Sequence, residues 1–164
     1  MTLNITRLVL LVSVLFITLS CRQNEYNSIN HLPVIQKSEV EILSLLNTPD
    51  PKSISLTLGL KSDTTFKLTM IVGEYEAQAL AVILKGLKPR APLPLDLLED
   101  AIIKFEYHVQ EVFIDSLKND FYTAKIICYS GEKKIELKAR PVDAVAIASK
   151  FSSPIFVNNA FLTR

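Results

Sequence analysis

The sequence predicts an α+β fold in which three helices pack on an antiparallel-rich sheet, with the element order βββααβββαβ. Short segments that alternate apolar and polar side chains predict the strands, and apolar stripes at the i, i+3, i+4, i+7 spacing predict the helices. Clusters of Pro, Gly, Asn and Asp separate these segments. The 164 residues include four Gly, eight Pro and 21% charged residues, which excludes collagen-like, low-complexity and disordered classes. A chain of this length is expected to form one domain.

The first half of the domain predicts three strands, at residues 40–46, 53–60 and 66–72. Alternate positions of the second strand are Ile or Leu, which is the pattern of a strand with one buried face. The intervening Asn-Thr-Pro-Asp-Pro and Lys-Ser-Asp-Thr segments favour turns, because Pro cannot donate to a strand ladder and Asn and Asp favour turn conformations. Gly73 is expected to end the third strand.

Two helices are predicted next, at residues 74–87 and 95–105. In the first, alanine and leucine side chains recur at helical spacing, and Gly86 marks its end. The proline-rich loop 88–94 separates it from the second helix. Asp96 lies in the first turn of that helix, where a carboxylate interacts favourably with the helix dipole.

The second half predicts strands at residues 109–116, 121–129 and 134–138, a third helix at 142–151 and a last strand at 155–157. Pro141 suits the first position of that helix, because its missing N–H costs nothing there. Cys128 lies within an apolar run, so we expect a buried, unreactive thiol rather than a nucleophile. Lysines on the strand at 134–138 favour an exposed edge strand over a nucleic-acid patch.

A weak internal repeat relates the first and third helices. Residues 76–81 (Glu-Ala-Gln-Ala-Leu-Ala) match residues 143–148 (Asp-Ala-Val-Ala-Ile-Ala) at an offset of 67 positions. Each segment follows a predicted strand after a short turn. The match predicts an internal duplication, with chance similarity between two alanine-rich helices as the alternative.

Residues 1–20 have the pattern of a secretory signal peptide. Arg7 precedes the apolar run LVLLVSVLFITL, and a small residue, Ser20, precedes Cys21. A helix formed by that run would span about 18 Å, which is short of the ~30 Å hydrocarbon core of a bilayer. The segment contains one Arg and no acidic residue, so the remaining chain has as many basic as acidic side chains.

The segment Thr-Leu-Ser-Cys at residues 18–21 resembles the lipobox of bacterial lipoproteins. The resemblance implies cleavage before Cys21, lipidation of Cys21 and attachment to a membrane of the cell envelope through that lipid. Thr18 replaces the usual Leu, which stands one place later. An ordinary cleaved signal and an uncleaved anchor are the alternatives. Residues 21–38 would then form a tether and residues 39–164 the domain.

Several motifs of the domain resemble the bifunctional nuclease family. They are Ile71-Val72-Gly73-Glu74 with Glu76-Ala77, Pro92-Leu93 with Asp96-Leu97-Leu98, Phe121-Tyr122-Thr123-Ala124, Ala139-Arg140-Pro141 with Asp143-Ala144-Val145-Ala146, and Pro154-Ile155. The resemblance implies an α+β domain that often forms homo-oligomers and acts on DNA and RNA.

The two most polar family motifs differ in this chain. The family's Arg-Pro-Leu-Thr-His-Asp loop reads Ala-Pro-Leu-Pro-Leu-Asp at residues 91–96. Its Asp-Ala-Arg-Pro-Ser-Asp motif reads Lys-Ala-Arg-Pro-Val-Asp at residues 138–143. The replacements remove a His, an acid, an Arg and two hydroxyl groups. If these groups carry out chemistry in the family, this chain has lost part of it.

Phosphodiester hydrolysis requires an activated water and positive charge near the phosphate. The candidate catalytic residues are Glu76, Asp96, Arg140 and Asp143, with Arg140 as the phosphate clamp. Glu74, Glu76 and Asp143 are the candidate ligands for a Mg²⁺ or Mn²⁺ ion, which prefers oxygen donors. The alternative is structural: acids in first helical turns that complement the dipole, and an Arg140 that pairs with Asp143.

Two functions follow as hypotheses. In the first, the chain is an exported, lipid-anchored nuclease that binds nucleic acid. In the second, it is a non-catalytic binding or oligomerisation module that retains the fold. The near-zero net charge argues against binding that depends on bulk positive charge. Two Cys cannot build a disulfide scaffold, and His31 and His108 lack a partner at metal-ligand spacing.

Overall fold

The computed structural model describes residues 36–164, which belong to one compact unit. The leader, Cys21 and most of the predicted tether lie outside the described residues. The elements, in chain order, are β1 (Lys37–Asn47), β2 (Ser53–Leu60), β3 (Asp63–Gly73), α2 (Glu74–Leu84), α3 (Pro94–Lys104), β4 (His108–Lys118), β5 (Phe121–Ser130), β6 (Lys133–Ala139), α4 (Pro141–Phe151), β7 (Ile155–Asn158) and the 3₁₀ helix η1 (Asn159–Phe161). The α+β class and the predicted order βββααβββαβ are confirmed.

Element ends differ from the sequence prediction by a few residues. β1 and β3 each begin three residues earlier than expected, because backbone pairing continues through charged residues that the apolar pattern does not mark. The first helix ends at Leu84 rather than residue 87, since Gly86 adopts a left-handed conformation with φ +62°. The second helix begins at Pro94, one residue early, with proline in the first turn where it is tolerated.

The seven strands form one sheet in the order β3-β2-β1-β7-β4-β5-β6. β1, β2 and β3 make one antiparallel meander, and β4, β5 and β6 make another. β7 joins the two meanders, antiparallel to β1 and parallel to β4. The lysine-bearing strand β6 is an edge strand, as its sequence predicts.

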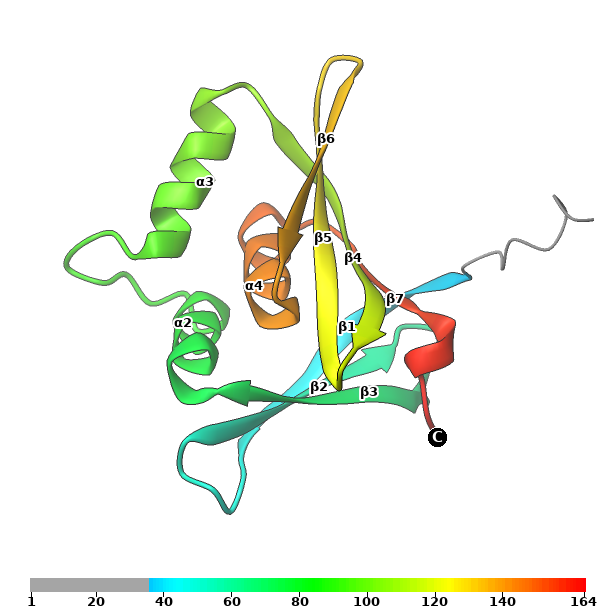
Figure 1. The fold of residues 1–164 in the computed structure, drawn as a ribbon. Coiled ribbons are helices and arrows are strands. Elements are labelled where there is room, and N and C mark those ends of the chain that lie inside the picture. Colours follow the sequence, from blue (N-terminus) through cyan, green and yellow to red (C-terminus); the bar gives the residue numbers. More distant parts are fainter. Residues whose placement is uncertain (1–35) are drawn as a thin grey trace, which may run out of the picture. The chain divides into compact units, whose positions relative to one another are not determined.

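The hydrophobic core lies between this sheet and α4. In Figure 1, α4 lies beside β4 and β5, and α2 follows directly from β3. Ala144, Val145, Ile147 and Ala148 of α4 are all buried, and alanine at two of these positions allows the helix to approach the sheet closely. Cys128 is buried in the same core, and its burial raises the pKa of the thiol, as expected of an unreactive cysteine.

The predicted internal repeat corresponds to a repeated arrangement of elements. Each half consists of three antiparallel strands followed at once by a helix, β1-β2-β3-α2 and β4-β5-β6-α4. The two helices contact each other (Figure 1). This shared topology agrees with a duplication. None of the helices within residues 36–164 has the length and apolar content needed to cross a membrane.

Candidate functional site

The first turns of α2 and α4 carry the central residues of the candidate site. Gly73 and Arg140 are the N-cap residues of α2 and α4, and both have extended backbone conformations. Glu76 and Asp143 are therefore the third residues of their helices, at equivalent places in the two halves. At this position a carboxylate lies near the positive end of the helix dipole.

Arg140 joins these two acids. Its Nε donates to Asp143 Oδ2 at 2.6 Å and its Nη2 donates to Asp143 Oδ1 at 3.2 Å, while its Nη1 donates to Glu76 Oε1. Asp143 and Glu76 together raise the pKa of the Arg140 guanidinium. The Arg140 side chain is nevertheless 63% exposed. A guanidinium has five N–H donors, and three are used here, so two remain for a ligand.

Gly73 provides room for the carboxylate of Glu76. A methyl group built on Gly73 would overlap with Glu76 Oε2. The absence of a side chain on Gly73 therefore lets the carboxylate fold back over the start of α2, toward Arg140. Gly73 thus leaves space for the Glu76 carboxylate, in addition to ending the strand as the sequence predicts.

A pocket of about 460 Å³ lies beside Arg140 and Glu76. Apolar side chains form much of its wall, among them Ile71, Val72 and Phe121. Pro141 and Val142 contribute from the first turn of α4. Pockets of this size with a few convergent polar groups are typical of small-ligand or active sites. The arrangement places Arg140 and the Glu76 carboxylate in the wall of an apolar recess, and Asp143 adjoins it through its bond to Arg140.

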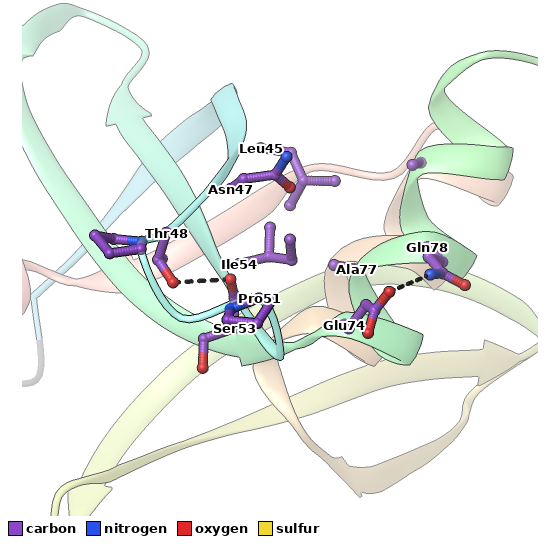
Figure 2. A pocket seen from close by; sticks show the side chains of 11 residues that line it. Leu45, Asn47, Thr48, Pro51, Ser53, Ile54, Glu74, Ala77 and Gln78 are labelled. Carbon is purple, nitrogen blue, oxygen red and sulfur yellow. Dashed lines mark hydrogen bonds between the residues drawn. The ribbon is translucent and has the colours of Figure 1, made fainter.

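Glu74 does not join this cluster. It lines a separate cleft of about 480 Å³ between the β1–β2 turn and α2, where Asn47, Ile54 and Gln78 are also found (Figure 2). Glu74 Oε1 accepts a hydrogen bond from Gln78 Nε2 at 2.9 Å. Two residues apart on one helical turn, Glu74 and Glu76 point in different directions. The proposed metal set of Glu74, Glu76 and Asp143 is therefore not gathered at one point.

Asp96 also lies in a different cluster. Lys150 Nζ donates to Asp96 Oδ1 and to Glu99 Oε2, each at 2.6 Å, and so ties α3 to α4. Asp96 Oδ2 accepts from the backbone N–H of Leu93 at 2.6 Å and caps α3. The bond from Lys150 and that from Leu93 lower the pKa of the Asp96 carboxyl. These contacts give Asp96 a structural role, as the N-terminal cap of α3 and as a link from α3 to α4.

Within the part of the chain that the structure describes, no three His, Cys, Asp or Glu side chains are grouped as a metal site would require. At the candidate site, Glu76 and Asp143 supply two carboxylates that both bond to Arg140. Mg²⁺ commonly uses one or two carboxylates and completes its shell with water and substrate oxygens. These two residues fit that kind of partial site. His108 is engaged elsewhere, in a stack with Tyr129 at 6.3 Å between ring centroids.

Sequence reasoning identified Arg140, Asp143 and Glu76, and the i, i+3 spacing of the first two already indicated a pair. It missed Lys150 as the partner of Asp96, although the position of Lys150 in the last turn of a predicted helix was a usable signal. It also gave no role to Phe121, whose ring is exposed at the start of β5. No local pattern marks that residue as part of a pocket.

Comparison with known proteins relates these features to a family. The family model described as "Bifunctional nuclease domain" matches residues 57–164. Two curated proteins of Mycobacterium tuberculosis, "Uncharacterized protein MT1877" of strain CDC 1551 / Oshkosh and "Uncharacterized protein Rv1829" of strain ATCC 25618 / H37Rv, are each 35% identical to this chain over 97 residues. The match covers 59% of this chain and 57% of each relative, so the chain spans little more than half of their length. Because the family model covers more than half of the chain, including Glu76, Arg140 and Asp143, the chain belongs to the bifunctional nuclease domain family.

Proposed function

We propose that this domain hydrolyses phosphodiester bonds in DNA or RNA, with Glu76, Arg140 and Asp143 at the reaction centre. The observation that supports the proposal most directly is the convergence of two carboxylates on one exposed guanidinium at the edge of a pocket. Membership of the bifunctional nuclease family agrees with it. The three groups match the needs of the reaction, a cation at the phosphate and a carboxylate that can accept a proton from water.

Charge balance at the centre implies a need for further positive charge. Glu76 and Asp143 carry two negative charges and Arg140 one positive charge, so the trio is formally −1. A phosphodiester is itself an anion, so without a further cation it would bind only weakly beside Arg140. Glu76 and Asp143 would hold a Mg²⁺ or Mn²⁺ ion, which supplies Lewis acidity and a more acidic bound water when present.

Arg140 has a distinct task in this proposal. One N–H group on each of Nη1 and Nη2 remains, and we propose that these two groups donate to phosphate oxygens. Asp143 keeps the guanidinium plane in place through its paired hydrogen bonds. Glu76 holds the other end of the guanidinium and, once released, can accept a proton from the attacking water. Gly73 leaves the space that the Glu76 carboxylate occupies.

A second candidate function is a non-catalytic binding or oligomerisation module. Three large apolar side chains on and after α3 are exposed and favour it, because a contact with a second protein would bury them: Leu97, Ile103 and Phe105. The loss of the family's His and hydroxyl groups near α3 and α4 points the same way. A concentration-dependent homo-oligomer with no hydrolytic activity would establish this alternative.

We further propose that the protein acts outside the cytoplasm, anchored through a lipid on Cys21. The short apolar run before Cys21 and the resemblance to a lipobox support this. These residues lie outside the described part of the structure. An exported nuclease would meet nucleic acid of the environment or of the envelope rather than the chromosome.

Hydrolysis by the purified full chain tests the proposed function. Fluorescently end-labelled single-stranded and double-stranded DNA and RNA are incubated with the protein in Mg²⁺, in Mn²⁺ or in EDTA, and the products are separated by electrophoresis. We expect cleavage only with the divalent ion. Glu76→Gln and Arg140→Ala should each lower the rate at least about 100-fold, the usual size of a lost charge-stabilising group.

Asp100→Asn is the matched control. Asp100 forms a single exposed ion pair with Lys104 on α3 and lines none of the pockets described above. Its variant should cleave at the wild-type rate. Equal rates for Arg140→Ala and Asp100→Asn would refute the proposed centre, because a contaminating nuclease is unaffected by either substitution.

A further inference from the structure

The pocket beside Arg140 continues into a second, basic one. This second pocket, of about 750 Å³, is lined by the end of the β4–β5 hairpin and the end of β6. Phe121, Tyr122 and Arg140 line both pockets, so the two recesses meet at these residues. The reaction centre proposed above therefore opens onto a longer surface groove.

Four basic residues and one acidic residue line the second pocket. Lys125 is neutralised locally, since its Nζ lies 3.1 Å from Asp115 Oδ2 and 3.7 Å from Glu136 Oε2. Lys118 and Lys138 form no ion pair with any other residue in the described range 36–164. Their charges are therefore available to a ligand, and both lysines line the same recess as Phe121.

Phe121 is the unusual side chain of this groove. It is the first residue of β5, pairs with Lys118 across the hairpin, and is 75% exposed. Asn119 and Asp120 form the tight turn between them in left-handed conformations, with φ +49° and +64°. The adjacent Tyr122 packs edge-on against Phe161, with ring centroids 5.1 Å apart. The hairpin thus presents an aromatic ring to solvent directly across from Lys118.

We infer that this groove binds single-stranded nucleic acid, with a base stacked on Phe121 and phosphates near Lys118, Lys138 and Arg140. An exposed aromatic ring flanked by cations is the arrangement that binds single strands, since a base offers its face only when it is unpaired and unstacked. A duplex would meet the lysines but not the ring. The inference rests on the proposed function, because it names the form of nucleic acid that reaches the same centre.

Binding in EDTA tests the inference without hydrolysis. Fluorescence anisotropy measures the Kd of the full chain for a labelled single-stranded DNA oligonucleotide, for the same strand with abasic sites and for the duplex. We expect the natural strand to bind best. Phe121→Ala should weaken its binding roughly 5- to 100-fold, the loss of one stacked base. Phe121→Trp should bind the strand about as well as the wild type does, which separates the loss of stacking from a folding defect.

Phe105→Ala is the matched control, since Phe105 is 74% exposed but lies at the end of α3, away from the groove. It should leave the Kd unchanged. The double variant Lys118→Ala, Lys138→Ala should lower the slope of log K against log salt by about 0.7 for each lysine removed. Lys104→Ala should not change the slope.

Equal affinity for natural and abasic strands, or equal effects of Phe121→Ala and Phe105→Ala, would overturn the inference. Tighter binding of the duplex would do the same and would indicate phosphate recognition alone. The experiments can refute this inference and the proposed function independently of each other. Phe121-dependent binding without any hydrolysis supports the groove and refutes the nuclease, whereas Arg140-dependent hydrolysis that is indifferent to Phe121 does the reverse.

Discussion

Glu76 and Asp143 occupy the same third position of two helices in the two halves of the fold, and both carboxylates accept hydrogen bonds from Arg140. Each carboxylate lies where the positive end of its helix dipole stabilises it. Arg140 therefore links the starts of two equivalent helices, although it lies 64 residues after Glu76 along the chain. The contact between α2 and α4 brings them together.

We expect Arg140 to contribute more to ligand binding than to stability. Each exposed ion pair contributes up to about 1 kcal/mol and Arg140 forms two, so Arg140→Ala should lower the free energy of unfolding by no more than about 2 kcal/mol. Asp143→Asn should also cost at most about 1 kcal/mol. Calorimetric titration with inorganic phosphate should show weak binding by the wild type and none by Arg140→Ala. A large stability loss together with no phosphate binding by the wild type would assign Arg140 a structural role.

Asp96 should make stability depend on acid pH. Hydrogen bonds from Lys150 and Leu93 lower its pKa in the folded state. Their contribution is therefore complete above the unfolded pKa of about 3.9 and is lost as pH falls through the lower folded value. Asp96→Asn should be less stable than wild type at pH 7. The difference in the free energy of unfolding, measured with urea, should shrink as the pH falls below about 4 toward the lower folded pKa. Asp100→Asn, whose ion pair is exposed, should follow the wild type throughout; a constant gap for Asp96→Asn would contradict this account.

Lengthening a buried alanine of α4 should destabilise the fold. Ala148 is 1% exposed and lies in the core cluster shared by helix and sheet. Ala148→Leu should cost about 1–3 kcal/mol by overpacking, measured as a lower urea midpoint at unchanged slope. Ala160→Leu, on the exposed face of η1, serves as the control and should be nearly neutral. Similar midpoints for both variants would mean that α4 does not need small residues against the sheet.

The proposed lipidation should depend on Cys21. Cells fed a radioactive fatty acid should label the wild-type protein, which should fractionate with membranes. Cys21→Ser should abolish the label, whereas Cys128→Ser should retain it, because Cys128 is buried in the folded domain. An unlabelled, freely soluble wild-type protein would show that residues 18–21 are not a lipobox.

Local patterns in the sequence determined the elements of this fold. Alternating apolar residues such as Leu56 and Leu58 specified a strand and the face it buries, and the alanine stripes specified two of the helices. Such signals are readable because they repeat with the geometry of the element itself. Strand ends were predicted less well, since backbone pairing extends β1 and β3 through residues whose side chains are exposed.

The sequence predicted those contacts of the site that join residues close together along the chain. The pair Arg140–Asp143 follows from three-residue spacing at a helix start, and the repeat pointed to Glu76 as the counterpart of Asp143. Tertiary structure alone decided that Glu76 reaches Arg140 while Glu74, two residues earlier, faces another cleft. It also decided that Asp96 pairs with Lys150 and that Phe121 lines one recess with Lys118 and Lys138. Contacts between distant segments depend on how α2, α3 and α4 pack on the sheet, which no short stretch of sequence encodes by itself.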